Sequence, residues 1–345
     1  MQVDHERFSR QILFKPIGET GQERLANSRV AIVGLGALGS ALAHHMARAG
    51  VGFLRLIDRD FVEKSNLQRQ MLYDEKDATA ELPKAIATAE KLRAIDTNLQ
   101  LEPIVTDVTW RNAESLLTDV DLILDGSDNF HLRYLINDVS LKYHIPWIYG
   151  GAVSSHGMNY TILPGTTPCI RCLFPEPPGA GTTQTCDTAG VIGPIVQIVA
   201  ARQGVEAIKW LVGDHDALDL KLRHTDLWKN EELSMDVTLQ RKPDCPACSE
   251  GLYEFLQPEN EEETTLSLCG RNTVQITHSP PQNLDLEKME QRLAPIAKVQ
   301  RNRFLLRAQV DENHRLILFP DGRVLVQGTS DPSLARSIAT RYLGG

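Results

Sequence analysis

The sequence lacks long apolar runs: no stretch of about 18 uninterrupted apolar residues, the length that spans a bilayer, occurs in the chain. Its first residues are charged from Asp4 and have no apolar core of signal-peptide length. Net basic charge is also absent, because the formal net charge is -9, which disfavours a broad electrostatic surface for nucleic acid or anionic lipid. We therefore expect a cytoplasmic protein that binds neither nucleic acid nor membrane.

Cysteine is scarce, and the 6 cysteines are not expected to form a disulfide framework in a reducing compartment. Four of them fall into two CxxC pairs, in "PCIRC" and "DCPAC": Cys169, Cys172, Cys245 and Cys248. Four thiolates brought together form a closed tetrahedral zinc site, which is structural because no coordination position is left for a substrate. A redox CxxC pair and unrelated thiols are the alternatives.

Cys186 stands apart in the polar segment "TTQTCDTAG", just before a long apolar helix that we expect from about residue 191. A thiol near a helix N-terminus has more thiolate character, which suits a nucleophile or a sulfur acceptor. An inert loop cysteine is the alternative.

Short β-rich apolar runs alternate with helical patterns from Arg29 onward. This rhythm predicts βαβ units, and hence an α/β, Rossmann-like, doubly wound and largely parallel sheet. We expect parallel strands at 29–34, 53–60, 99–105, 120–126 and 146–153 and helices at 37–50, 83–95, 112–118, 129–144 and 191–212. Hairpin-like runs at 158–165, 218–228 and 233–240 predict that antiparallel strands continue the sheet.

The acidic run "QPENEEETT" has the composition of a linker. We expect a first domain over residues 1–256 with an N-terminal helical arm, a linker over 257–265, and a small α+β domain over 266–345. The small domain is expected to contain strands at 269–277, 301–311, 314–322 and 323–328 and helices at 285–297 and 331–344.

Gly34, Gly36 and Gly39 have the GxGxxG spacing between an expected strand and an expected helix. Such glycines allow a tight turn, close approach of the backbone to phosphate and close helix packing, and the helix N-terminus attracts an anion. Asp58, at the end of the second strand, sits where an acid binds ribose hydroxyls. These features alone fit NAD as well as ATP.

The polar residues that follow help to distinguish between NAD and ATP as the ligand. A triphosphate about to be cleaved needs cations for the charge that develops, whereas a hydride carrier needs few beyond its pyrophosphate site. The segment "DRDFVEKSNLQRQ" and the later "LPKA" supply Asp58, Asp60, Asn66, Arg69, Gln70 and Lys84. We interpret this set as phosphate chemistry; solvated surface charge is the alternative for Arg69 and Lys84.

Asp128, in "LDGSDNFHLR", follows an apolar strand at the carboxyl edge of the expected sheet, where ligands of open α/β folds bind. A carboxylate there can hold Mg²⁺ together with phosphate oxygens. The alternative is that Asp128 is the N-cap of the helix that begins near Asn129.

Together these segments resemble the ThiF/MoeB/HesA adenylyltransferases, bacterial relatives of the ubiquitin-activating enzymes. The resemblance covers about residues 7–249 and rests on "ERFSRQILF", "VAIVGLGALGS", "LIDRDFVEKSNLQRQ", "LPKA", "DGSDN", "PCIRC", "CDTAGVIGP" and "CPAC" in family order. It implies ATP-dependent adenylation of the C-terminal glycine carboxylate of a small β-grasp sulfur carrier ending in Gly-Gly, of the ThiS or MoaD type, in thiamine or molybdenum cofactor synthesis. A cysteine desulfurase or another sulfur donor would then act on the product.

The resemblance also implies roles for single residues. Gly36 and Ala37 would lie along the nucleotide, Asp58 would hold the ribose, and Asn66, Arg69 and Lys84 would contact phosphates, with Asp60, Gln70 and Asn129 nearby. Asp128 matches the acid associated with Mg²⁺ and the α-phosphate. Arg10 matches an arginine that reaches the triphosphate of the partner subunit, which implies a homodimer. Cys186 matches a cysteine that can be joined covalently to the carrier.

Two departures from the family pattern stand out. The spacing before Lys84 is slightly longer than usual, and the tail resembles an accessory module rather than a sulfur donor. Three alternatives stay open: an NAD-dependent oxidoreductase, a scaffold that binds a ubiquitin-like partner without catalysis, and adenylation of a peptide or tRNA-linked carboxylate.

Overall fold

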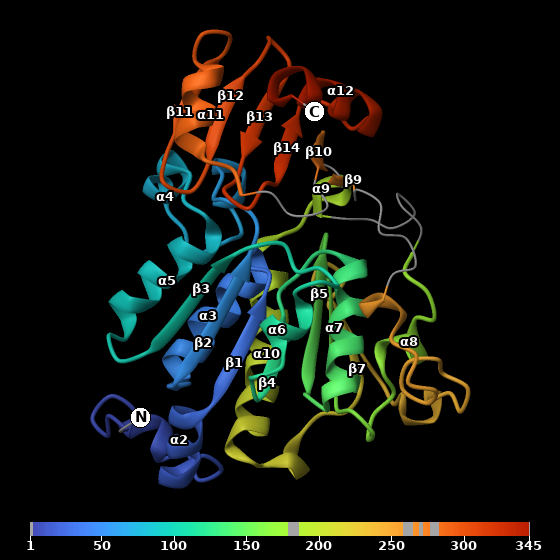
Figure 1. The fold of residues 1–345 in the computed structure, drawn as a ribbon. Helices are drawn as coiled ribbons and strands as arrows, with labels where there is room; N and C mark the ends of the chain where they lie inside the picture. Colours follow the sequence, from blue (N-terminus) through green and yellow to red (C-terminus); the bar gives the residue numbers. More distant parts are fainter. Residues whose placement is uncertain (1–2, 179–185, 258–264, 269–271, 277–282, 345) are drawn as a thin grey trace. The chain divides into compact units, whose positions relative to one another are not determined.

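A computed structural model describes residues 3–178, 186–257, 265–268, 272–276 and 283–344 (Figure 1). The chain divides into two compact units, residues 1–257 and 258–345. The expected linker lies largely outside the described residues, and its last residue, Thr265, begins a strand. Among the described residues, no helix combines the length and apolar composition of a bilayer crossing.

The first unit is built on an eight-stranded sheet in the order β3-β2-β1-β4-β5-β6-β7-β8. Strands β1 to β5 pair in parallel, whereas β6, β7 and β8 continue the sheet in antiparallel fashion. The predicted fold class is therefore confirmed. The strands are β1 (Arg29–Val33), β2 (Phe53–Asp58), β3 (Gln100–Val105), β4 (Leu122–Asp125), β5 (Trp147–Val153), β6 (His156–Ile162), β7 (Leu222–Asp226) and β8 (Glu231–Met235).

Helices cover both faces of this sheet (Figure 1). They are α1 (Ser9–Ile12), α2 (Gly18–Asn27), α3 (Ala37–Ala49), α4 (Glu75–Ala80), α5 (Lys84–Ile95), α6 (Ala113–Leu117), α7 (Phe130–Tyr143), α8 (Ile170–Leu173), α9 (Cys186–Ala189) and α10 (Gly193–Val212). Short α4 was not predicted. It is capped at Asp74, whose carboxylate accepts from the backbone N–H groups of Lys76 and Asp77, a local signal that the apolar periodicity does not carry.

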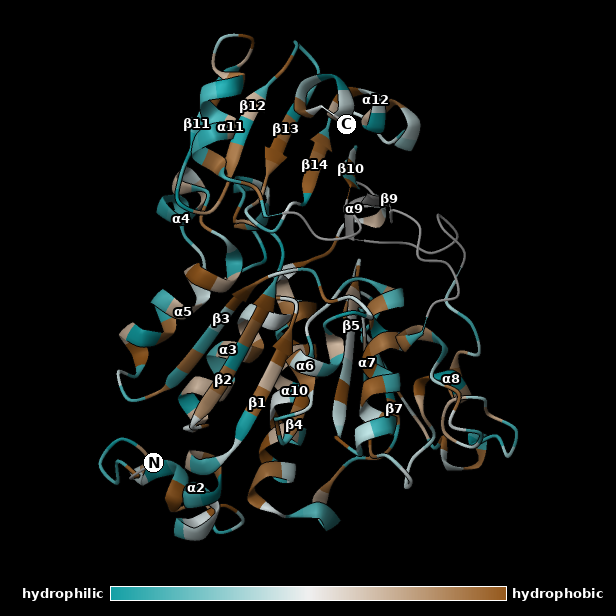
Figure 2. Ribbon diagram, in the orientation of Figure 1, coloured by the Kyte–Doolittle hydropathy of each residue, from teal (hydrophilic) through white to brown (hydrophobic). Residues whose placement is uncertain are grey.

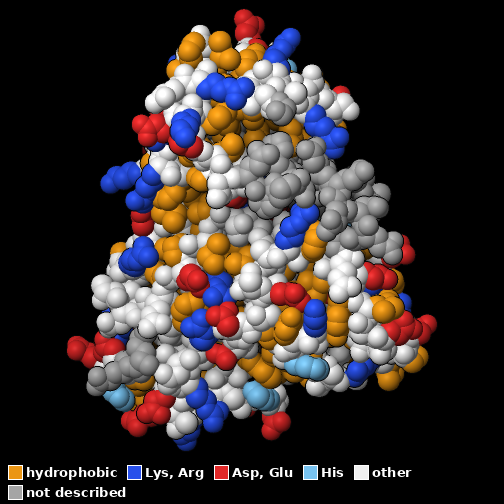
Figure 3. Space-filling view, in the orientation of Figure 1, with side chains coloured by type: hydrophobic (Ala, Val, Ile, Leu, Met, Phe, Trp, Pro, Cys, Tyr) orange, Lys and Arg blue, Asp and Glu red, His pale blue; other side chains and the backbone are white. Residues whose placement is uncertain are grey.

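The central strands are apolar along their length because both of their faces are buried, as the hydropathy colouring shows (Figure 2). In β1, Val30 and Ile32 join a core that also contains α3, α5 and α10, while Ala31 and Val33 join the core under α6 and α7. Alternate residues of one strand thus serve two cores. On the face drawn in Figure 3, acidic and basic side chains are interspersed rather than gathered by sign.

The second unit is a six-stranded antiparallel sheet in the order β11-β12-β13-β14-β10-β9. Its elements are β9 (Thr265–Leu268), β10 (Thr273–Ile276), α11 (Leu286–Leu293), β11 (Lys298–Arg301), β12 (Leu306–Gln309), β13 (Arg315–Leu318), β14 (Val324–Gln327) and α12 (Pro332–Leu343). Leu293 and Ile338 pack their helices on the sheet around Val326. The four-residue strands β9 and β11 were not predicted, because such short runs carry little periodicity.

Candidate functional site

The glycine loop follows β1 and leads into α3. Gly34 has φ +83°, in the left-handed region, and a Cβ atom on Gly39 would lie 1.7 Å from the Gly34 carbonyl oxygen. Gly36 is the N-cap of α3 and makes no side-chain capping bond. No side chain at the N-cap thus competes for the first N–H groups of α3, and a helix N-terminus of this kind is a position where anions bind.

A second loop, between β4 and α7, lies against the glycine loop. The N–H of Gly126 donates to the Val33 carbonyl at 2.9 Å, and a Cβ atom on Gly126 would be 2.4 Å from the Gly34 carbonyl oxygen. Because β1 lies between β2 and β4 in the sheet, the chain changes direction here. Such a switch point is where open α/β sheets bind ligands.

Asp58 links the end of β2 to the glycine loop. One carboxylate oxygen accepts from the N–H of Leu35 and the other from the N–H of Asp60, both at 2.6 Å. Burial raises the pKa of the Asp58 carboxyl, although the neighbouring Lys84 ammonium opposes this shift. The acid is thus fixed beside the loop, with one acceptor site left on each oxygen.

Lys84 is the first residue of α5 and is only 2% exposed. Its Nζ lies 3.2 Å from Oδ2 of Asp60, and its backbone N–H donates to the Asp60 carbonyl at 2.9 Å. A buried ammonium needs such a partner. The longer spacing before Lys84 accommodates α4 and still delivers this lysine to the end of β2.

Residues of the "SNLQRQ" segment differ in their exposure. Asn66 is buried, and its Oδ1 accepts from the N–H of Glu63 at 3.1 Å, which fixes the turn. Gln70 is 2% exposed, and its Nε2 lies 3.9 Å from the position of a Cβ atom on Gly36. Arg69 is half-buried and donates to the Ser65 carbonyl at 3.0 Å. Gln70 is therefore the member of the segment that is seen to reach the glycine loop.

Asp128 is exposed in the β4–α7 loop. Burial lowers the pKa of Arg59 and of Arg133, but nearby acidic charges, of which Asp128 is one of the smaller contributors, raise both pKa values overall. The alternative that Asp128 caps the helix is wrong. Asn129 is the N-cap of α7, and its Oδ1 accepts from the N–H of His131 at 2.9 Å. The cap falls one residue later than that alternative required, which leaves the Asp128 carboxylate out of the helix hydrogen bonds.

Arg133 was not predicted as a site residue; it is 5% exposed and lies under this loop. Its guanidinium donates to Oδ2 of Asp125 at 2.9 Å, to the Ser127 carbonyl at 2.8 Å and to the Gly150 carbonyl at 3.0 Å. An arginine within a helical pattern gives no signal that it is buried. Its position close after "DGSDN" was the only hint.

Arg10 is not brought to the glycine loop of its own chain. It is exposed on α1, and its neighbour Gln11 donates to the Ala49 carbonyl at the C-terminal end of α3, at 2.8 Å. The glycine loop is at the other end of α3, which for 13 residues is about 20 Å away.

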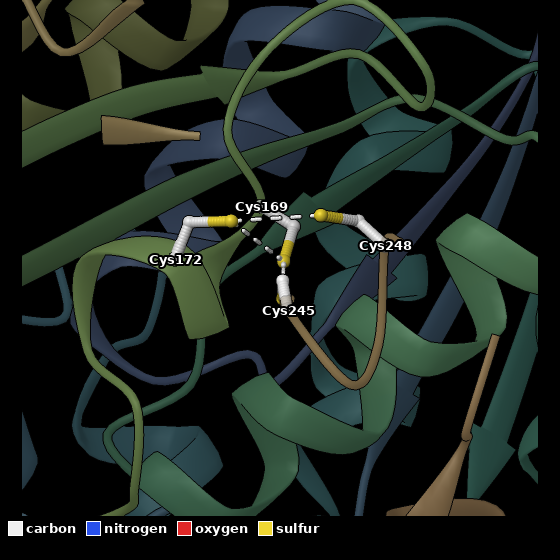
Figure 4. A group of neighbouring side chains, drawn as sticks. All are labelled: Cys169, Cys172, Cys245 and Cys248. Atoms are coloured by element: carbon white, nitrogen blue, oxygen red, sulfur yellow. Dashed lines mark hydrogen bonds between the residues drawn. The ribbon is translucent and has the colours of Figure 1, made fainter. Parts of the chain in front are cut away.

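The two CxxC pairs come together, as predicted (Figure 4). The Sγ atoms of the four cysteines all lie within 4.8 Å of one another, and Cys169 and Cys245 are 3.7 Å apart. Thiolates at about 2.3 Å from a tetrahedral zinc ion are about 3.8 Å apart, so the cluster fits that ion. Asn137 of α7 fixes the first pair by accepting from the N–H of Ile170 at 3.0 Å.

Cys186 begins α9, but its side chain lies outside the described part of the chain, so its role stays a prediction. Cys269 also lies outside the described residues.

Comparison with known proteins gives a family and relatives. Residues 8–247 match the model of the ThiF family. The chain is 42% identical over 339 residues to the sulfur carrier protein ThiS adenylyltransferase of Bacillus subtilis, covering 98% of this chain and 99% of that protein. It is 39% identical to the SAMP-activating enzyme E1 of Haloferax volcanii, over 73% of this chain and 92% of that protein. A structure of E. coli MccB with ATP is similar in fold, with a TM-score of 0.60 and 22% identity over 70% of this chain and 74% of that one.

Proposed function

The chain belongs to the ThiF family, as the sequence resemblance predicted, and we propose that it is an adenylyltransferase for a small ubiquitin-like sulfur carrier protein. It transfers AMP from ATP to the carrier's C-terminal glycine carboxylate and releases pyrophosphate. The observation that carries this proposal is the 42% identity to a ThiS adenylyltransferase across 98% of this chain. Such coverage includes the second unit as well as the nucleotide site.

In the reaction, a carboxylate oxygen attacks the α-phosphorus of ATP and the bond between the α-phosphorus and the bridging oxygen to the β-phosphate breaks. Pyrophosphate leaves with the electron pair. A glycine carboxylate is already ionised at neutral pH, so the chain needs no base. Its task is to position the two reactants and to stabilise the charge that moves onto the leaving group.

We assign the nucleotide to the region between the two loops. The N–H groups at the start of α3, from Ala37, face the phosphates, and Asp58 holds the ribose through its remaining acceptor sites. Arg69 and Lys84 carry phosphate charge, and the Lys84–Asp60 contact holds the ammonium beside the ribose-binding strand. Asn66 and Gln70 supply amide donors from the next turn.

Asp128 is assigned to the reaction centre, because it is an exposed carboxylate on a loop in backbone contact with the glycine loop. With Asn129 beside it, it offers the oxygen donors that Mg²⁺ takes in proteins. Bound there, Mg²⁺ would neutralise phosphate charge.

Arg10 is assigned to the nucleotide site of a second copy, because α1 packs at the far end of α3 from its own loop. This assignment requires a homodimer with composite sites. The cysteine cluster is assigned to structural zinc, since four thiolates leave the metal no free position.

The carrier adenylate is a mixed anhydride that a sulfur nucleophile can attack, with AMP as the leaving group. Cys186 is our candidate for a covalent contact with the carrier during that step. A cysteine desulfurase or another donor would supply the sulfur.

The decisive experiment is ATP–pyrophosphate exchange with ThiS-type and MoaD-type carriers offered one at a time. We expect exchange that depends on both ATP and an intact Gly-Gly terminus, and that carriers lacking the last glycine do not support. If none of the carriers supports exchange and the protein binds NADH tightly, the result would instead favour an NAD-dependent oxidoreductase.

A further inference from the structure

Asp128 depends on its neighbours for its position. Within the described part of the chain its side chain takes no hydrogen bond, and it is exposed. Its place beside the glycine loop is therefore set by the backbone immediately before and after it. After it, Asn129 is the N-cap of α7; before it lies Ser127.

Ser127 is held by hydrogen bonds to Asp125 and to Arg133. Oδ1 of Asp125 accepts from both the N–H of Ser127, at 2.9 Å, and its hydroxyl, at 2.6 Å. The Ser127 carbonyl accepts from Arg133 at 2.8 Å. The peptide that joins Ser127 to Asp128 is thus held at its oxygen by one guanidinium.

Arg133 is itself immobilised. Its Nε donates to the Asp125 carboxylate, and the Nη2 group that bonds Ser127 also donates to the Gly150 carbonyl. The ring centroids of Phe130 and Tyr149 lie 5.0 and 4.9 Å from its guanidinium carbon. It therefore ties the end of β4 and the middle of β5 to the first turn of α7. A rigid fork of donors is what arginine offers and lysine does not.

We propose that Arg133 is a positioning residue that fixes the Asp128 carboxylate at the reaction centre by holding the Ser127 carbonyl. This inference rests on the proposed function and adds a residue that acts only through Asp128. Arg133 is 5% exposed and its three hydrogen bonds go to protein groups, so we assign it no contact with nucleotide or carrier. Its loss should lower the rate of adenylation and leave the KM for ATP near the wild-type value.

The test is a double-mutant cycle in carrier-dependent ATP–pyrophosphate exchange. We expect Arg133→Gln to lower kcat by about 10- to 100-fold, the usual loss when the support of a catalytic ligand is removed. The double variant with both Arg133→Gln and Asp128→Asn should have almost the same kcat as Asp128→Asn alone. Losses that multiply in the double variant would overturn the proposal, because independent sites contribute independently.

Arg55 provides the matched control. It is equally buried at 6% exposed, and it bonds Glu102, Asp119 and the Leu116 carbonyl, away from the β4–α7 loop. The effect of Arg55→Gln should multiply with that of Asp128→Asn. If Arg133→Gln does not fold, Arg133→Lys keeps the charge beside Asp125 but cannot span the two carbonyls, and it should show the same non-multiplying loss.

A second readout needs no carrier. The affinity for Mn²⁺ in the presence of a non-hydrolysable ATP analogue, measured by electron paramagnetic resonance, should fall in both Asp128→Asn and Arg133→Gln. Absence of exchange in the wild-type protein with every carrier would defeat the proposed function but leave this comparison intact. A loss of Mn²⁺ affinity in Asp128→Asn that Arg133→Gln does not share would overturn the positioning role.

Discussion

Lys84 and Asp60 form a buried ion pair where β2 ends and α5 begins, with Nζ 3.2 Å from Oδ2 and Lys84 only 2% exposed. The pair places a fixed positive charge next to Asp58 and the glycine loop. A cation held this way costs no reorganisation when charge develops on a leaving group.

Replacing Lys84 by alanine should therefore lower kcat for ATP–pyrophosphate exchange by about 100- to 1,000-fold. The control is Lys91→Ala in the same helix, since Lys91 pairs with Asp74 and Asp77 at 30% side-chain exposure. Lys91→Ala should keep the wild-type rate. A Lys84→Ala variant that folds and exchanges normally would remove Lys84 from the reaction.

Gly39→Ala should abolish ATP binding and destabilise the fold by about 1 to 3 kcal/mol, because the new Cβ atom would collide with backbone. The collision is with the Gly34 carbonyl oxygen, 1.7 Å away. Gly204→Ala in α10 is the matched control, since its Cβ atom would meet nothing closer than 3.6 Å; it should leave binding intact and stabilise by up to about 1 kcal/mol. Calorimetric titration with ATP and thermal unfolding provide both readouts.

Mixing two inactive variants tests the composite site. Arg10→Ala and Asp128→Ala should each abolish exchange, and their equal mixture after subunit exchange should recover about a quarter of wild-type activity. Half of randomly assorted dimers are mixed, and each mixed dimer has one intact site of two. No recovery from a mixture shown by light scattering to contain mixed dimers would place Arg10 elsewhere.

Asp138 should make stability depend on pH. Burial in α7 raises the pKa of its carboxyl from 3.8 to about 6, although the hydrogen bond that the carboxylate accepts from the Phe255 N–H lowers that pKa in part. Because the folded pKa lies above the unfolded one, its stabilising contribution is complete below about pH 4 and is lost as the pH rises through about 6. Asp138→Asn should therefore gain up to about 3 kcal/mol over wild type at pH 7 and little at pH 4, measured by urea unfolding. A gain that is equal at both values would contradict the assignment.

Metal removal tests the cysteine cluster. The purified protein should contain about one zinc ion per chain, and a strong chelator should lower its Tm. Cys245→Ser should lose the metal, whereas Cys186→Ser should retain it; elemental analysis distinguishes the two. Full metal content in Cys245→Ser would exclude the four-thiolate site.

The sequence predicted what local chemistry determines. The spacing of Gly34, Gly36 and Gly39 predicted a strand, a turn and a helix, and at Gly34 and Gly39 a Cβ atom would collide with backbone. The buried position of Arg133 was not predicted, because it depends on acceptor groups far away in the sequence, such as the Gly150 carbonyl. The short strands β9 and β11 were not predicted for the same reason. Pairing with β10 and β12, rather than a pattern in their own four residues, makes them strands.

The cysteine cluster has one topological consequence. It joins the turn at Cys169 and Cys172 to the turn at Cys245 and Cys248, and so closes a loop that contains the whole of α10 and the strands β7 and β8. With the metal in place, a chain cut anywhere in this loop remains a single particle, its two pieces linked through the cluster as well as through packing. The segment from Cys172 to Cys245, with α10, β7 and β8, is thus a loop closed by a removable metal ion, and it is where this protein could be divided into two separately expressed pieces.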